Sequence, residues 1–329
     1  MMIDLSTPEV AFAVEAVRTA GQLARAVQAE LVEPALMKAD RSPVTVADFA
    51  AQALVGCLFE RAFSGVPLVA EEDAHALRAS EAEATLNTVT KFVRRFLIEA
   101  TPQAVCDWID RGNGQPDDRF WALDPVDGTK GFLRREQYAV ALAYLVEGSV
   151  QVGALACPNL TDAQSPEPGG PGSLIVAVRG HGAWVSPLDG GDFRRLRVSQ
   201  RDDPGQARLL RSVESGHTNV GRIGTLIETL RVEAEPVLMD SQAKYAVLAA
   251  GRGDLLFRLL SSKQPDYRER IWDQAAGSLV VEEAGGRITD LFGKPLDFTA
   301  GKTLANNRGV MASNGHLHEA ALAALREAL

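Results

Sequence analysis

The chain has 329 residues, of which 46 % are hydrophobic and 23 % are charged, so it can bury a core as one large domain or as two halves. The formal net charge is −9 and no basic stripe is visible, which argues against a protein that binds nucleic acid polymers. The N-terminus shows no signal pattern and no apolar stretch approaches the length of a membrane span. We therefore expect a cytoplasmic protein that does not enter membranes.

The three cysteines, Cys57, Cys106 and Cys157, are widely spaced. They form no CxxC motif and no histidine cluster accompanies them. This arrangement predicts reduced cysteines rather than a disulfide framework or a zinc site.

The N-terminal part of the chain is predicted to be helical. An amphipathic pattern covers residues 8–32 and is ended by Pro34, and further helices are expected over 45–63 and 80–99. The polar segment 111–118 contains glycines and predicts a surface loop.

Acidic residues stand at the borders of two of these early segments. Asp48 lies in the first turn of the helix over 45–63, and Glu71 follows the apolar stretch 66–70, which places it at the end of a strand. Glu72 and Asp73 come directly after Glu71, and we expect them to shape the loop or to hold an outer metal rather than to bind a central one. Taken alone, Asp48 is a first-turn acid favoured by the helix dipole.

A central motif then follows the apolar run Phe120–Leu123, which predicts a buried strand that ends at Asp124. Asp127 comes three residues later. Pro125, with its fixed φ, allows both carboxylates to face one point and allows the Val126 carbonyl to join them. A compact, negative, all-oxygen site of this kind suits Mg²⁺.

Gly128 and Thr129 open the next segment. Their backbone N–H groups are placed as at the start of a helix, where phosphate groups bind. The alternative for this segment is an Asp-Gly turn that only caps a helix.

After the central motif the pattern changes to short strands, which are expected over 137–146, 150–156, 174–178 and 182–185, with a solvent loop over 161–172. A turn-rich crossing over 186–206 leads to alternating strands (209–213, 237–239, 255–259) and helices (218–231, 242–251, 273–283). This order predicts a first half, 1–198, with helices over a largely antiparallel sheet, and an α/β second half, 199–329.

Three motifs in this order resemble the inositol monophosphatase superfamily of lithium-sensitive, Mg²⁺-dependent phosphatases. They are the acids after a strand at Val69–Asp73, the loop Asp124–Thr129, and the helix start Trp272–Gly277. The resemblance spans about residues 38–290. It implies an αβαβα layered sandwich of two subdomains with the site between them.

Within this superfamily the chain is most similar to the 3'(2'),5'-bisphosphate nucleotidases. The similarity lies in the extended loop Asp127–Val140 and in the segments Ser212–His217 and Asp240–Tyr245. One departure is Arg135, which stands where that branch usually has glycine, so the loop is expected to be stiffer or more positive there.

The resemblance implies a metal role for each acid. One Mg²⁺ would be held by Glu71, Asp124 and the Val126 carbonyl. A second ion, at the lithium-sensitive position, would be held by Asp124, Asp127 and Asp273, with two or three ions per site in all.

The resemblance also pairs the Thr129 hydroxyl with Asp48 beside the attacking water, with Glu71 on the same water. Groups implied to contact the substrate are Gly128, Thr129, His217, Ser241, Lys244, Arg258 and Asp273. Two cations and an imidazole suit a bisphosphate better than a neutral sugar. Without the resemblance, Lys244 is a solvated helix residue and His217 a loop histidine.

The resemblance therefore implies a hydrolase that removes the 3'-phosphate from adenosine 3',5'-bisphosphate, and from its sulfated form, to leave AMP. Inositol phosphatase and histidinol-phosphatase activities are the alternatives within the same chemistry. A regulator that binds phosphorylated metabolites without catalysis is the alternative from a different class. The expected partner is a small phosphate ester, and the chain is expected to be a monomer or a homodimer.

Overall fold

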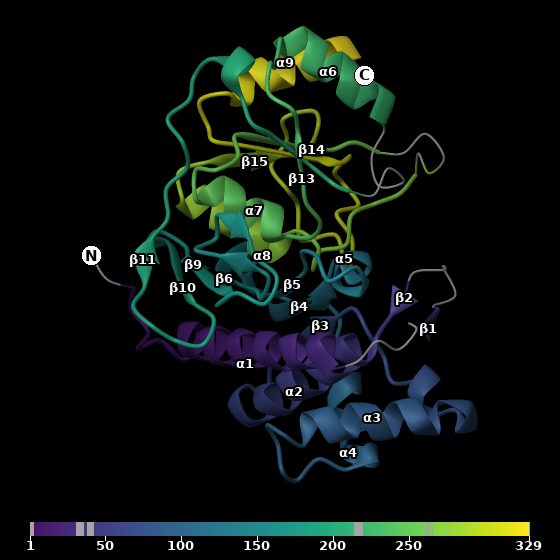
Figure 1. Ribbon diagram of the computed structural model, residues 1–329. Coiled ribbons are helices and arrows are strands. Elements are labelled where there is room, and N and C mark those ends of the chain that lie inside the picture. Colours follow the sequence, from purple (N-terminus) through teal and green to yellow (C-terminus); the bar gives the residue numbers. More distant parts are fainter. Residues whose placement is uncertain are drawn as a thin grey trace.

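Two mixed β-sheets form the framework of the molecule (Figure 1). The computed structural model describes residues 3–30, 36–37, 43–213, 220–260, 264 and 266–328. The larger sheet has seven strands in the order β11-β10-β9-β6-β5-β4-β3, and the smaller has five in the order β13-β12-β14-β16-β15. Two short hairpins accompany them.

The strands of the larger sheet are β3 (Leu68–Ala70), β4 (Arg119–Asp127), β5 (Ala139–Val146), β6 (Ser149–Cys157), β9 (Ser173–Val178), β10 (Gly182–Pro187) and β11 (Arg194–Arg195). The smaller sheet contains β12 (Leu209–Arg211), β13 (Val237–Leu238), β14 (Leu255–Arg258), β15 (Arg287–Thr289) and β16 (Val310–Ser313). The hairpins are β1 (Leu36–Met37) with β2 (Pro43–Val44) and β7 (Leu160–Thr161) with β8 (Ser165–Pro166). The larger sheet is antiparallel except for the parallel pair β3 and β4.

The helices lie in layers on both sides of the sheets. They are α1 (Pro8–Glu30), α2 (Val46–Ala62), α3 (Glu83–Val93), α4 (Pro102–Asp110), α5 (Thr129–Leu133), α6 (Val220–Leu230), α7 (Ala243–Ala249), α8 (Ala275–Glu283) and α9 (His318–Ala328). Helices α1 and α2 cover one face of the larger sheet, α7 and α8 lie between the two sheets, and α6 and α9 cover the far face of the smaller sheet (Figure 1). The predicted αβαβα sandwich is confirmed.

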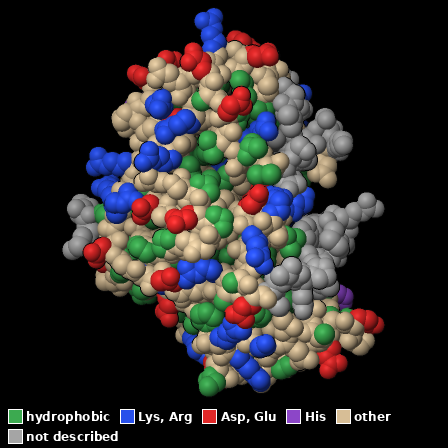
Figure 2. All heavy atoms as spheres, in the orientation of Figure 1, with side chains coloured by type: hydrophobic (Ala, Val, Ile, Leu, Met, Phe, Trp, Pro, Cys, Tyr) green, Lys and Arg blue, Asp and Glu red, His purple; other side chains and the backbone are tan. Residues whose placement is uncertain are grey.

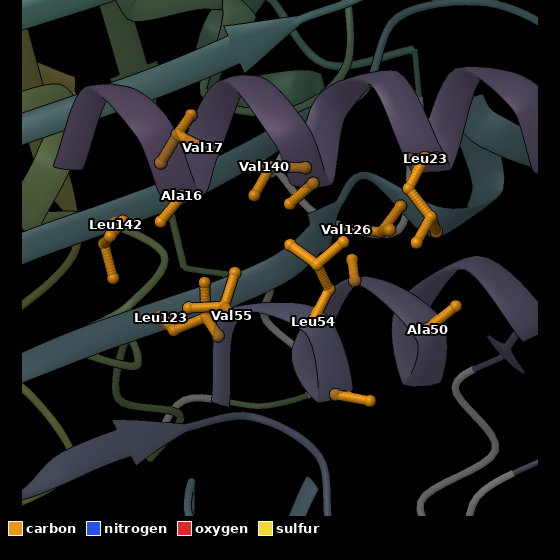
Figure 3. Close-up of a cluster of buried hydrophobic side chains, with 14 of the residues drawn as sticks. Ala16, Val17, Leu23, Ala50, Leu54, Val55, Leu123, Val126, Val140 and Leu142 are labelled. Atoms are coloured by element: carbon orange, nitrogen blue, oxygen red, sulfur yellow. The ribbon is translucent and has the colours of Figure 1, made fainter. Parts of the chain in front are cut away.

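Alternation along β4 shows why this strand belongs in the middle of the sandwich. Trp121 and Leu123 are buried toward α1 and α2, while Phe120 and Ala122 are buried toward α7 and α8. Successive side chains on a strand point to opposite faces, so β4 has an apolar layer on both sides. Figure 3 shows Leu123 of this strand beside Val55 of α2.

The core between the two sheets crosses the expected division between residues 198 and 199. The two sheets lie on either side of that position, but α7 and α8 share one apolar cluster with the inner face of the larger sheet. The halves are thus joined by a continuous core. The division itself stays a prediction.

Several element boundaries differ from the sequence prediction. Strand β4 does not end at Asp124 but continues to Asp127. The helix expected over 80–99 is a 3₁₀ turn followed by α3, which ends at Val93, and Phe96 is partly exposed. A separate helix, α4, begins after Thr101, whose hydroxyl accepts a hydrogen bond from the Ala104 N–H. Thr-Pro at a helix start is a recognisable signal that the prediction did not use.

In the second half, α8 begins at Ala275, so Asp273 lies in the turn before the helix rather than in its first residue. The segment 161–172 includes part of the β7–β8 hairpin. The C-terminal elements β16 and α9 had no counterpart in the prediction. In the described part of the chain, no helix combines the length and hydropathy needed to cross a bilayer.

The face of the molecule seen in Figure 2 carries Lys and Arg side chains interspersed with Asp and Glu. No continuous basic band is visible on that face. This distribution agrees with the acidic net charge of −9.

Candidate active site

Glu71 and Asp124 are brought next to each other by the pairing of strands β3 and β4. Strands β3 and β4 are parallel, with Ala70 opposite Leu123, so the next residue on each strand is an acid, Glu71 on one and Asp124 on the other. The carboxyl ends of parallel neighbours meet at one edge of a sheet. This pairing places the Glu71 and Asp124 backbones next to each other.

Strand β4 continues past Asp124 with an irregularity that turns Asp127 toward the same region. Asp124 pairs with Ala141 and Asp127 with Ala139, so β4 has one extra residue relative to β5. Such a bulge bends a strand and redirects its side chains. Pro125 lies inside it, beyond the end of β3, where its missing N–H removes no bond to that strand.

Gly128 makes the turn from β4 into α5. Its φ is +85°, and a Cβ at this position would lie 2.8 Å from the Ser241 Cβ. Glycine is therefore required both by the backbone conformation and by the close approach of the second half. The Thr129 hydroxyl donates to the Val126 carbonyl at 3.3 Å.

The second half of the chain reaches this point through the turn before α7. Ser241 has φ +65°, which is unusual for a residue other than glycine. The next backbone N–H, that of Gln242, donates to Asp127 Oδ2 at 2.6 Å. Asp127 on β4 is thereby tied to the start of α7.

Asp48, Glu71, Asp124, Asp127 and Asp273, which we call the acid cluster, are close enough to act on one another electrostatically. Burial raises the pKa of Asp124 well above its usual value, and the other four acids raise it further. Burial also raises the pKa of Asp273, with Asp127 and Glu71 adding to the effect and Arg258 opposing it. Clustered carboxylates with perturbed pKa values are typical of functional sites.

Asp124 has an unsatisfied polar atom at the centre of this cluster. Its side chain is 2 % exposed, and its Oδ1 has no hydrogen-bond partner within the described residues. A buried carboxylate oxygen without a donor is costly unless a ligand or ion completes it. The donor set around it consists of hard oxygen atoms, which fits a divalent cation such as Mg²⁺.

Two cations face the cluster from the second half. Lys244 on α7 is 6 % exposed, its ammonium group donates to the Met239 carbonyl at 3.3 Å, and burial lowers its pKa to about 8 although Asp127 opposes the shift. Arg258 at the end of β14 pairs with Glu269 at 2.7 Å. Burial disfavours the charged form of Arg258, but Glu269 and other anionic neighbours raise its pKa overall.

Asp48 and Thr129 both form hydrogen bonds with residues close to them in the chain. Asp48 Oδ2 accepts hydrogen bonds from the N–H and the hydroxyl of Thr45, at 2.7 and 2.6 Å, and so caps α2. These contacts with Thr45 are those expected of an acid in the first turn of a helix, which was the alternative interpretation of Asp48. The Thr129 hydroxyl donates to the Val126 carbonyl, and its pairing with Asp48 stays a prediction.

The sequence analysis also named His217 and Arg135. His217 lies outside the described residues. Arg135, at the position where glycine is usual, has φ +60°, which explains why glycine suits that position.

Sequence reasoning missed three residues in contact with the site. Gln242 lies within the motif Asp240–Tyr245, but nothing in the sequence separates it from its neighbours. Glu269, the partner of Arg258, stands between two arginines and resembles a surface charge. Gln52 lies on the same face of α2 as Asp48, four residues later, which is a helical spacing that could have indicated it.

A model of the inositol monophosphatase family matches residues 6–329. The chain belongs to the inositol monophosphatase family.

Among the relatives of this chain within the family is a 3'(2'),5'-bisphosphate nucleotidase from Oryza sativa, 41 % identical, with 98 % of this chain and 94 % of the relative aligned. A protein of the same name from Schizosaccharomyces pombe is 40 % identical over 93 % of this chain and 91 % of its own length. An IMPase of Thermotoga maritima has the same fold, with a TM-score of 0.67, 21 % identity and 98 % of both chains covered.

Proposed function

We propose that this chain is a Mg²⁺-dependent phosphomonoesterase that hydrolyses adenosine 3',5'-bisphosphate to AMP and inorganic phosphate. The observation that carries the proposal is the buried, unsatisfied Asp124 oxygen among four other acids, with the buried cation Lys244 and the partly buried Arg258 near Asp127. The names of the relatives from Oryza sativa and Schizosaccharomyces pombe support the nucleotide substrate. The sulfated form of the nucleotide is a second substrate under the same proposal.

The chain's acids would hold the metal in two sets that share Asp124. Glu71, Asp124 and the Val126 carbonyl would form one, and Asp124, Asp127 and Asp273 the other. Within the described ranges, no group of three or more His, Cys, Asp or Glu side chains is already arranged to hold an ion. Like charges oppose the ionisation of neighbouring carboxylates, and a bound cation would offset that repulsion. Bound Mg²⁺ would supply a Lewis acid that activates water and offsets charge on the phosphoryl oxygens.

The remaining residues would bind and orient the nucleotide. Gly128 and Thr129 would contact the reacting phosphate, and Thr129 with Asp48 would orient the attacking water. Water adds to phosphorus, the bond to the 3'-oxygen breaks, and that oxygen takes a proton to become the 3'-hydroxyl of AMP. Lys244, Arg258, Ser241 and His217 would hold the parts of the nucleotide that do not react, and Lys244 is already beside Asp127.

Phosphate release from a substrate panel tests the proposal. The panel holds adenosine 3',5'-bisphosphate, its sulfated form, inositol monophosphate and histidinol phosphate, each assayed with Mg²⁺, with Mg²⁺ plus Li⁺, and with a chelator. We expect the bisphosphate to give the highest kcat/KM, chelator to abolish turnover, and Li⁺ to inhibit it.

Each other outcome selects an alternative. Preference for an inositol or histidinol phosphate would transfer the function to that substrate. Saturable binding of the bisphosphate with no turnover of any ester would indicate a non-catalytic regulator. Full turnover in chelator would contradict the metal mechanism.

A further inference from the structure

Gln242 binds Asp127 of the proposed second metal set and also holds the peptide group that precedes Asp273. Its backbone N–H donates to Asp127 Oδ2 at 2.6 Å. Its side-chain Nε2 donates to the Trp272 carbonyl at 2.9 Å, which belongs to the peptide group directly before Asp273. Its Oε1 accepts from the Gly277 N–H at 2.9 Å, in the first turn of α8. Gln242 is 1 % exposed, and its two side-chain contacts are buried.

Gln52 holds the peptide group that follows Glu71, the acid directly after β3. Its Oε1 accepts at 3.0 Å from the Glu72 N–H, which belongs to the peptide group directly after Glu71. Its Nε2 donates to the Glu72 carbonyl at 2.5 Å and to the Ile109 carbonyl at 2.9 Å. Gln52 is fully buried, one helical turn after Asp48 on α2.

The choice of glutamine in both places has a chemical reason. A side-chain amide carries a donor and an acceptor, so one residue can hold a backbone carbonyl and a backbone N–H together. Lysine and arginine only donate, and a carboxylate only accepts. The amide is also neutral, so it anchors these segments without compensating or adding to the negative charge that attracts a cation.

Backbone bonds also hold these segments: the Ala70 N–H donates to the Gly112 carbonyl at 2.8 Å and the Ile271 N–H to the Lys302 carbonyl at 3.2 Å. The two glutamines add side-chain bonds at the peptide groups next to the acids. Glu71 follows β3 and Asp273 lies in a turn before α8, more than 200 positions later in the chain. Helices α7 and α8 pack at the Gly277 position, where an added Cβ would lie 2.1 Å from the Tyr245 ring. This close packing fixes the helices, and the Gln242 side chain extends that order to the turn that carries Asp273.

We propose that Gln52 and Gln242 are positioning residues that fix the peptide groups beside Glu71 and Asp273, so that these carboxylates can close on a shared cation with little reorganisation. The proposal rests on the proposed metal site. Residues that orient metal ligands typically change metal affinity or activity by about ten- to a hundredfold when they are removed.

Gln242→Met and Gln52→Met test it, because methionine keeps the length of the side chain and removes the amide. The Gln242 backbone bond to Asp127 survives the change. Mg²⁺ binding is measured by calorimetry on the protein without substrate, and KM for the bisphosphate at saturating Mg²⁺. We expect the Mg²⁺ Kd to rise about ten- to a hundredfold in each variant, while KM changes by less than about threefold.

Asn314→Leu is the matched control. Asn314 is a buried amide in the second half that binds Ser199, Arg201 and the Leu317 N–H, and it touches none of the acid cluster. It should lower the melting temperature as the other variants do, and leave the Mg²⁺ Kd unchanged. Gln242→Asn and Gln52→Asn keep a neutral but shorter amide, and they replace any methionine variant that does not fold.

The outcomes separate the two proposals. If the unchanged protein binds no Mg²⁺, the metal site itself is wrong. If it binds Mg²⁺ and the glutamine variants bind it equally well, the positioning role is wrong. A rise in Kd for Asn314→Leu as large as for the glutamine variants would also overturn it, because the effect would then come from lost stability.

Discussion

Asp124 and Lys244 are both buried, and burial acts on them in opposite directions. It raises the pKa of the Asp124 carboxyl and lowers that of the Lys244 ammonium to about 8, so each is pushed toward its neutral form. A cation at Asp124 and an anionic phosphate at Lys244 would each restore the charged form. The two residues thus suit ligands of opposite sign, and Asp127 interacts electrostatically with Lys244.

Lys244 gives a residue-scale prediction about specificity. In Lys244→Met, kcat/KM on adenosine 3',5'-bisphosphate should fall about ten- to a hundredfold, because one charge-assisted contact to the phosphate that is not cleaved is lost. Turnover of adenosine 3'-monophosphate should barely change, since that substrate has no second phosphate. Steady-state kinetics on the two substrates provide the measurement and the control.

Equal losses on both substrates would place Lys244 at the reacting phosphate or in the core instead. Arg258 is less suited to the experiment, although the same role is proposed for it. Its removal would leave the buried Glu269 carboxylate without its ion-pair partner, and the resulting loss of stability would obscure the effect on binding.

At the element scale, a buried histidine joins three elements of the second half. His318 begins α9, and its ring nitrogens lie 2.8 Å from Ser313 Oγ on β16 and 3.2 Å from Thr289 Oγ1 on β15. Burial lowers its pKa from the usual 6.5 to about 4. The His318 ring is therefore neutral in the folded state down to about pH 4. In the unfolded chain the same ring binds a proton once the pH falls below 6.5.

This difference predicts how stability depends on pH. The depressed pKa of His318 should cost the protein stability as the pH falls from about 6.5 toward 4, by about 2 kcal/mol between pH 7 and pH 5. Urea unfolding at both pH values checks this, with His318→Gln as the comparison. The acids contribute equally to both proteins, so the variant should lose about 2 kcal/mol less over this interval. Identical losses would contradict the assignment.

At the scale of the whole molecule, the acid cluster is assembled from both halves. Glu71, Asp124 and Asp127 come from the larger sheet, whereas Asp273 comes from the turn before α8 in the layer between the sheets. A cation that binds all of them would bind the folded chain and not the unfolded one. Such a ligand shifts the folding equilibrium by mass action.

Mg²⁺ should therefore raise the melting temperature by a few degrees, because a ligand at about 100 times its Kd stabilises by about 2.7 kcal/mol. Thermal denaturation with Mg²⁺ and with chelator provides the measurement. Asp124→Asn, which removes the shared ligand, should abolish the shift and nearly all turnover. A variant that kept both the shift and the activity would show that the cation binds elsewhere.

The local pattern of the sequence was enough to predict part of the site. The strand at Phe120–Leu123, the acids Glu71 and Asp124 that follow apolar runs, and the glycine at 128 depend on neighbouring residues, so alternation and turn chemistry indicate them. Many helices and strands were predicted for the same reason, although α4, β15, β16 and α9 were missed and α8 begins later than expected. The family resemblance supplied the layered arrangement.

Only the tertiary structure decided which distant groups meet. The bond from Gln242 to Asp127 spans 115 positions, the Arg258–Glu269 pair joins the end of β14 to the chain before α8, and Gln52 reaches from α2 to the end of β3. Such contacts form because packing of the layers brings these segments together, and no local periodicity encodes them. The acids could be named from the sequence, whereas the bonds that Gln52 and Gln242 make to the neighbouring peptide groups were seen only in the folded chain.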